Sequence, residues 1–163
     1  MRVNNHNDGF TFIEVLIATI LVGLAIASLM AANRAFTTAN DAGTDLSTAE
    51  FLIEQVKELM SLLPVVDPQT DITTFGPETG ETLAGYDDLD DFNGASFSPP
   101  INANRSVLTD YATFSQQVTV QNVSASNFEQ VVGDHGSYFV RVTVSVYQNS
   151  QQITTASWLR ARY

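Results

Sequence analysis

The sequence predicts an α+β fold in which one long N-terminal helix packs on a small antiparallel β-sheet. Residues 10–63 contain no proline and carry apolar side chains at helical spacing. Residues 112–163 alternate apolar and polar side chains with a period of two, the pattern of half-buried strands. The intervening residues 64–111 hold all five prolines of the chain and are expected to be largely irregular.

Composition excludes several classes of protein. The 163 residues allow one compact domain besides the long helix. A net charge of −11 argues against nucleic-acid binding and against electrostatic docking on anionic lipid headgroups. The chain has no cysteine, and its two histidines, His6 and His135, leave little material for a multi-histidine metal site or a catalytic triad. We therefore expect a protein that is not an enzyme.

Residues 10–33 form a predicted transmembrane helix. A helix needs about 20 apolar residues to cross a bilayer, and here the only ionisable side chain is Glu14. A chain of this size has no core large enough to surround a helix that is apolar on all sides. Small residues recur along the segment and favour close approach of another helix, although they are also common in membrane spans generally; they are Ala18, Gly23, Ala27 and Ala31.

Glu14 is the anomaly of this segment, because a carboxylate near the start of a span is unfavourable unless it is paired. A cut between Gly9 and Phe10 would create a cationic α-amine on Phe10. Glu14 lies four residues further on, so the two groups would share one face of a helix. In a homopolymer, the amine of one subunit could instead pair with Glu14 of its neighbour.

The segment from Gly9 to Ala18 resembles the N-terminal cleavage and methylation motif of type IV pilins and type II secretion pseudopilins. The marks of that motif are present as Gly9 before the cut, Phe10 after it, Glu14 and the apolar helix that follows. The resemblance covers about the first third of the chain. It departs from the family pattern in a leader with little positive charge, where Arg2 is opposed by Asp8.

The resemblance implies a division of the chain and a function. Residues 1–9 would be a leader removed by a prepilin peptidase, which would also methylate Phe10, and residues 10–33 would hold the chain in the membrane and guide assembly through Glu14. Residues 34–163 would form a pilin-like domain outside the cytoplasm. The expected role is a structural subunit, a minor pilin or a pseudopilin, whose partners are other such subunits and the inner-membrane assembly machinery.

The resemblance also implies a single pass through the inner membrane with the N-terminus in the cytoplasm. Charge alone does not decide this orientation, because Arg2 and Arg34 lie on opposite flanks of the span. One alternative is a membrane-anchored binding protein that does not polymerise. Another is a secreted protein cut after the apolar run by signal peptidase, which the over-long apolar segment disfavours.

Residues 34–63 are expected to continue the helix as far as Pro64. An apolar stripe at helical spacing begins at Leu46 and ends at Leu63, while most charged residues fall on the other face. We expect this stripe to pack against the sheet.

The region 64–111 is centred on an acidic loop. Asp87, Asp88, Asp90 and Asp91 lie within five residues, followed by Asn93-Gly94. The favoured interpretation is a solvated acidic turn, and the alternative is a Ca²⁺ site, since Ca²⁺ prefers oxygen ligands in loops. Glycosidase-type acid/base chemistry would need two carboxyl groups in distinct environments, which adjacent acids on an exposed loop rarely provide.

Residues 112–163 are expected to form the antiparallel sheet. The pattern predicts three strands, near residues 114–121, 138–147 and 153–160, with Asn149-Ser150 turning between the last two. Residues 124–136 are expected to be a connection in which His135 is a turn residue.

Overall fold

The computed structural model describes residues 9–68 and 74–162. It contains one long helix, α1 (Phe12–Ser61), and one five-stranded antiparallel sheet. The chain divides into two units, with the boundary in the sequence between Gly43 and Thr44. The α+β class predicted from the sequence is confirmed.

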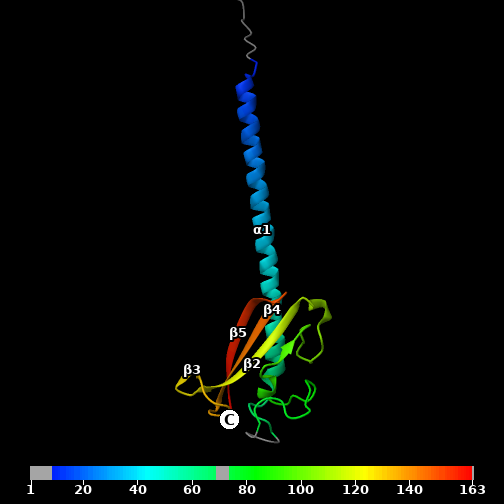
Figure 1. Cartoon of the computed structure of the whole chain (residues 1–163), viewed down its shortest axis with the longest axis vertical. Helices are drawn as coiled ribbons and strands as arrows, with labels where there is room; N and C mark the ends of the chain where they lie inside the picture. The colour runs from blue at the N-terminus through cyan, green and yellow to red at the C-terminus, as the bar shows by residue number, and fades with distance from the viewer. Residues whose placement is uncertain (1–8, 69–73, 163) are drawn as a thin grey trace, which may run out of the picture. The chain divides into compact units, whose positions relative to one another are not determined.

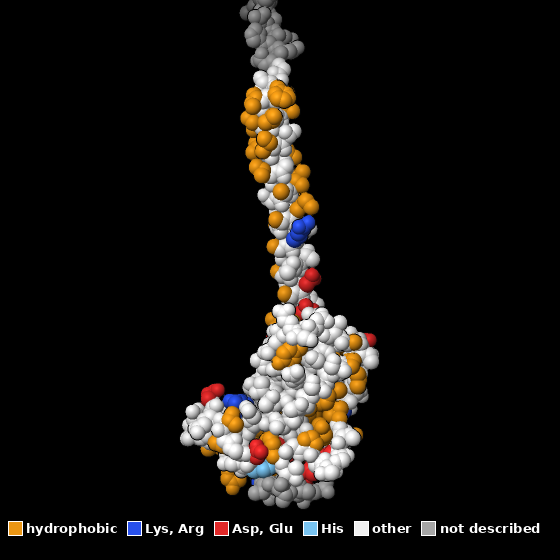
Figure 2. All heavy atoms as spheres, viewed as in Figure 1, with side chains coloured by type: hydrophobic (Ala, Val, Ile, Leu, Met, Phe, Trp, Pro, Cys, Tyr) orange, Lys and Arg blue, Asp and Glu red, His pale blue; other side chains and the backbone are white. Residues whose placement is uncertain are grey.

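The described part of the first unit consists of Gly9–Gly43 and is the N-terminal part of α1 with its lead-in. Every residue in it is exposed. Figure 2 shows hydrophobic side chains spread over the visible surface of this part of the helix. Within the described residues, α1 is the one helix long and apolar enough to cross a membrane, and its apolar segment near the N-terminus is unburied.

The second unit is built on the sheet, whose main strand order is β1-β2-β4-β5, with β3 added to the end of β2. The central pairs align Val118 with Val144 and Val120 with Val142. The strands are β1 (Ser96–Phe97), β2 (Phe114–Ser124), β3 (Asn127–Val131), β4 (Phe139–Gln148) and β5 (Gln151–Ala161).

Three of these strands were predicted, and two were missed. The turn at Asn149-Ser150 is confirmed, with φ values of 49° and 69° that match a tight hairpin. The expected connection 124–136 contains β3, all of whose residues are exposed and which therefore shows no alternation of burial. The predicted irregular region 64–111 contains β1 and two short 3₁₀ helices, Asp90–Phe92 and Thr109–Tyr111.

The core of the second unit forms between one face of α1 and one face of the sheet, as the apolar stripe predicted. Strand β4 alternates buried and half-buried residues along its length. Each fully buried valine or leucine contributes roughly 1.5–3 kcal/mol relative to exposure. The facing side chains are Ala49, Leu52, Ile53, Val56 and Met60 from α1, with Val118, Val120, Val140, Val142, Val144 and Val146 from the sheet.

The C-terminus of α1 is held by a cation from a distant strand. The helix ends at Ser61, slightly before the predicted Leu63. The Arg160 guanidinium donates hydrogen bonds to the carbonyl oxygens of Met60 at 2.9 Å, Ser61 at 3.0 Å and Leu63 at 2.9 Å. These bonds satisfy carbonyls that have no partner within the helix and tie β5 to the end of α1.

Candidate functional site

The residues of the predicted processing motif lie at the start of α1. Gly9 and Phe10 precede the helix, and the Phe10 side chain is 90% exposed. Glu14 occupies the first turn. All three are therefore accessible in the isolated chain.

Glu14 has a partner that sequence reasoning missed. Its carboxylate accepts a hydrogen bond from the Thr11 backbone N–H at 2.8 Å and another from the Thr11 hydroxyl at 2.7 Å. The Glu14 N–H lies 3.3 Å from the Thr11 hydroxyl oxygen, to which it donates. This is a capping box, in which a threonine and a glutamate three residues apart satisfy the free N–H groups of a helix start. The signal was present in the sequence as Thr11-x-x-Glu14.

The surface beside Glu14 is apolar. A shallow depression runs along this face of α1 from Phe10 to Val22. Ala18, one residue of the small-residue stripe, lies in it, and its short side chain leaves little steric bulk there. The other residues lining it are Glu14, Val15 and Thr19.

The acidic loop is not the solvated turn that the sequence favoured. Asp88, Asp90 and Asp91 are 2%, 3% and 1% exposed, whereas Asp87 is half-buried. The aspartates are buried because their neighbours in the loop, Leu89 and Phe92, are completely buried in the core.

Two of the aspartates fold the loop by binding its backbone. Asp88 Oδ1 accepts hydrogen bonds from the N–H groups of Asp90 at 2.9 Å and Asp91 at 3.1 Å. Asp91 Oδ2 accepts from the N–H groups of Asp87 at 2.8 Å and Asp88 at 3.3 Å. These reciprocal bonds hold the Asp90–Phe92 3₁₀ helix in place.

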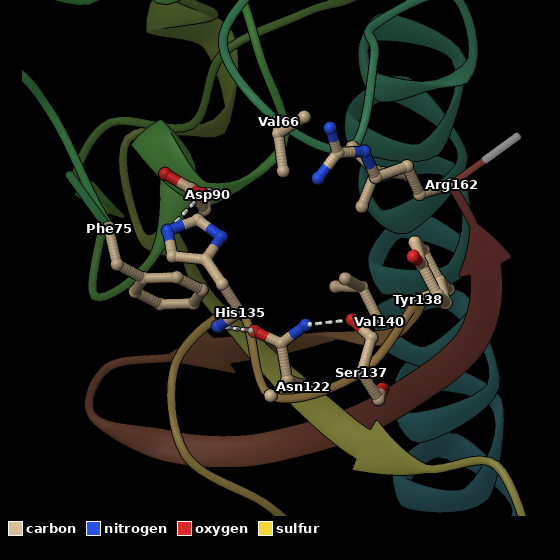
Figure 3. A pocket seen from close by; sticks show the side chains of 11 residues that line it. Val66, Phe75, Asp90, Asn122, His135, Ser137, Tyr138, Val140 and Arg162 are labelled. Atoms are coloured by element: carbon tan, nitrogen blue, oxygen red, sulfur yellow. Dashed lines mark hydrogen bonds and ion pairs between the residues drawn. The ribbon is translucent and has the colours of Figure 1, made fainter. Parts of the chain in front are cut away.

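Asp90 joins this loop to two other segments. Its Oδ1 accepts a hydrogen bond from the Gly76 N–H at 2.7 Å. Its Oδ2 lies 4.0 Å from His135 Nε2, which donates to the Thr74 carbonyl at 2.8 Å. Figure 3 shows Asp90 and His135 facing each other at the edge of a pocket of about 230 Å³, which Phe75 and Asn122 also line.

Two carboxylate oxygens in this loop are buried without a hydrogen-bond partner among the described residues, Asp90 Oδ2 and Asp91 Oδ1. Among those residues, the ion-pair geometry places one basic side chain near this cluster, His135, whose Nε2 lies 4.0 Å from Asp90 Oδ2. The nearby Arg105 binds backbone carbonyls instead, those of Leu83, Ala84 and Tyr86.

The charged forms of these aspartates are unfavourable in the free protein. Burial raises the pKa of Asp88 to about 8, and the neighbouring charge of Asp90 adds to this shift. Burial likewise raises the pKa of Asp90 to about 6, against the hydrogen bond from Gly76. The pKa of Asp91 is raised by burial as well, while the hydrogen bonds from Asp88 and Asp87 oppose this shift.

Three of the four predicted metal ligands come together. Asp88, Asp90 and Asp91 each offer a carboxylate oxygen, and these oxygens lie within 4.8 Å of one another. Asp87 is not part of this group. Glu78 and Glu81, which sequence reasoning did not consider, form a second such group with Asp91.

His135 was predicted to be a turn residue, and it does lie in a turn, with a φ of 55°. Its contact with Asp90 was not foreseen, since the two residues are far apart in the sequence.

Comparison of the chain with models of protein families, with curated proteins and with solved structures found no match in any of the three.

Proposed function

We propose that this protein is a structural subunit, of the minor pilin or pseudopilin kind, that is held in the inner membrane and assembles through its N-terminal helix. The observation that carries the proposal is the arrangement of Gly9, Phe10 and Glu14 at the head of an apolar helix. No charged residue occurs between Val15 and Asn33, and the whole segment is exposed.

Such a surface needs a non-aqueous environment. A leader cut after Gly9 would leave the N-terminus of Phe10 beside Glu14 at the membrane boundary, with the bulk of the chain outside the cytoplasm. In the assembled state, neighbouring copies would replace lipid around the apolar face that includes Ala18. The Phe10 amine of one copy would then pair with Glu14 of the next.

A second candidate is a membrane-anchored binding protein that does not polymerise. The Thr11–Glu14 capping box favours this candidate, because it gives the carboxylate hydrogen-bond partners without a second copy. The two candidates differ in whether the helices of several copies pack in an ordered way.

Cysteine cross-linking in membranes tests the proposal, because the chain has no cysteine of its own. Cysteines introduced at Ile17 and Leu24 would lie about 10 Å apart along one helix, beyond the reach of an intramolecular disulfide. Oxidation in cells that contain the assembly machinery is expected to give a ladder of covalent multimers.

The Ile17→Cys variant alone is the matched control, since one cysteine per chain yields dimers at most. If the double variant also stops at monomers and dimers, the copies do not form an ordered array and the anchor is the better description.

A further inference from the structure

The buried acidic loop has the spacing of a cation site. Calcium binds oxygen ligands at about 2.3–2.6 Å, so ligands on opposite sides of one ion are separated by about 5 Å or less. The oxygens offered by Asp88, Asp90 and Asp91 lie within 4.8 Å of one another and so meet this requirement without rearrangement of the backbone.

The loop also has oxygen atoms left over for a ligand. The backbone N–H groups occupy one oxygen each of Asp88, Asp90 and Asp91. Asp90 Oδ2 and Asp91 Oδ1 remain buried without a hydrogen-bond partner within the described part of the chain. A buried ionised oxygen without a partner is strongly unfavourable, so a site of this kind needs either protons or a cation.

Few basic side chains among the described residues lie near the three buried aspartates. His135 Nε2 is 4.0 Å from Asp90 Oδ2, but it already donates to the Thr74 carbonyl. Glu78 and Glu81, each of which offers an oxygen within 4.8 Å of one from Asp91, add further acidic groups.

We propose that Asp88, Asp90 and Asp91 bind one Ca²⁺ ion, with Glu78 and Glu81 beside Asp91 completing the acidic surroundings. The donors are all hard carboxylate oxygens, which excludes a preference for soft metals. The irregular arrangement suits Ca²⁺ better than Mg²⁺, which demands near-octahedral geometry and retains several waters.

The bound ion would fasten the long loop region to the core. Asp90 already contacts Gly76, and the residues that follow it are bonded to β2, where the Gly94 N–H donates to the Val118 carbonyl at 3.0 Å. By neutralising the buried aspartates, the ion would stabilise the contacts of the loop with Gly76 and with β2. The chain has no disulfide that could hold these segments together instead. The site does not depend on assembly, because all its residues belong to one copy.

The test is binding and thermal unfolding of the full-length chain in detergent, freed of metal and then titrated with CaCl₂. Trp158, the single tryptophan, packs against the core and reports unfolding by fluorescence. Calcium is expected to raise the unfolding temperature by several degrees and to give saturable heat in calorimetry. Absence of both effects in the wild-type chain at millimolar Ca²⁺ would overturn the proposal.

The informative variants are Asp91→Asn and the double variant Asp90→Asn with Asp91→Asn. An asparagine oxygen still accepts the backbone hydrogen bonds that fold the loop, but the carboxylate charge is gone. We expect the single variant to weaken Ca²⁺ binding at least about tenfold and the double variant to abolish the temperature shift. Asp110→Asn, at an exposed position, is the matched control and should behave as the wild type. An unchanged response in the double variant would contradict the assigned ligands.

Discussion

The Glu14→Gln variant is expected to lose the ladder of cross-linked multimers while still entering the membrane. Glutamine keeps an oxygen that accepts the hydrogen bonds now donated by Thr11, so the helix cap survives. It removes the negative charge that would attract the Phe10 amine of a neighbouring copy. The substitution therefore separates the capping role of Glu14 from its role in assembly.

The matched control is Glu50→Gln, an equal loss of charge at an exposed position of the same helix in the second unit. This control should retain the ladder. A Glu14→Gln chain that assembles as well as the control would mean that Glu14 serves the cap alone, and the charge-pairing part of the proposal would have to be abandoned.

The Gln116→Leu variant is expected to be strongly destabilised. Gln116 is completely buried in β2, where its Oε1 accepts from the Ile101 N–H at 2.8 Å. Its Nε2 donates to the carbonyls of Leu52 at 2.8 Å and Ile101 at 3.1 Å. Leucine fills a similar volume but leaves these groups without the side-chain partner, and each buried group left unpaired costs about 1–3 kcal/mol.

Gln117→Leu provides the comparison, because Gln117 is the next residue of β2 and its side chain is exposed. It should change the free energy of unfolding by no more than about 0.5 kcal/mol. Denaturant titrations of both variants, followed by Trp158 fluorescence, measure the difference. Equal stability of the two variants would show that the Gln116 hydrogen bonds do not hold the α1, loop and β2 segments together.

The regular elements could be predicted because each carries its own periodicity. The stripe that includes Leu52 and Val56 repeats at helical spacing, and the valines of β4 alternate along the strand. Each pattern reports which face is buried, so the packing of helix on sheet also followed. Strand β3 was missed because it is exposed on both faces and shows no alternation, and β1 was missed because it is only two residues long.

The interior polar contacts could not be predicted in the same way. Gln116 breaks the apolar face of β2, and its partners Ile101 and Leu52 are distant in the sequence. A cluster of aspartates is typical of exposed loops, and its burial depends on where Leu89 and Phe92 insert into the core. The aspartates at 88, 90 and 91 could be named from the sequence, but not their burial, their unpaired oxygens or their approach to His135.

The proposed function rests on the processing of the N-terminus, which the intact mass of the membrane-extracted chain measures most directly. In cells that contain a prepilin peptidase, we expect the mass of a chain that begins at Phe10 and carries one added methyl group. N-terminal sequencing of the same sample should begin at Phe10. A chain that still begins at Met1, or one that begins beyond Ala32, would contradict the proposed role of the segment from Gly9 to Glu14.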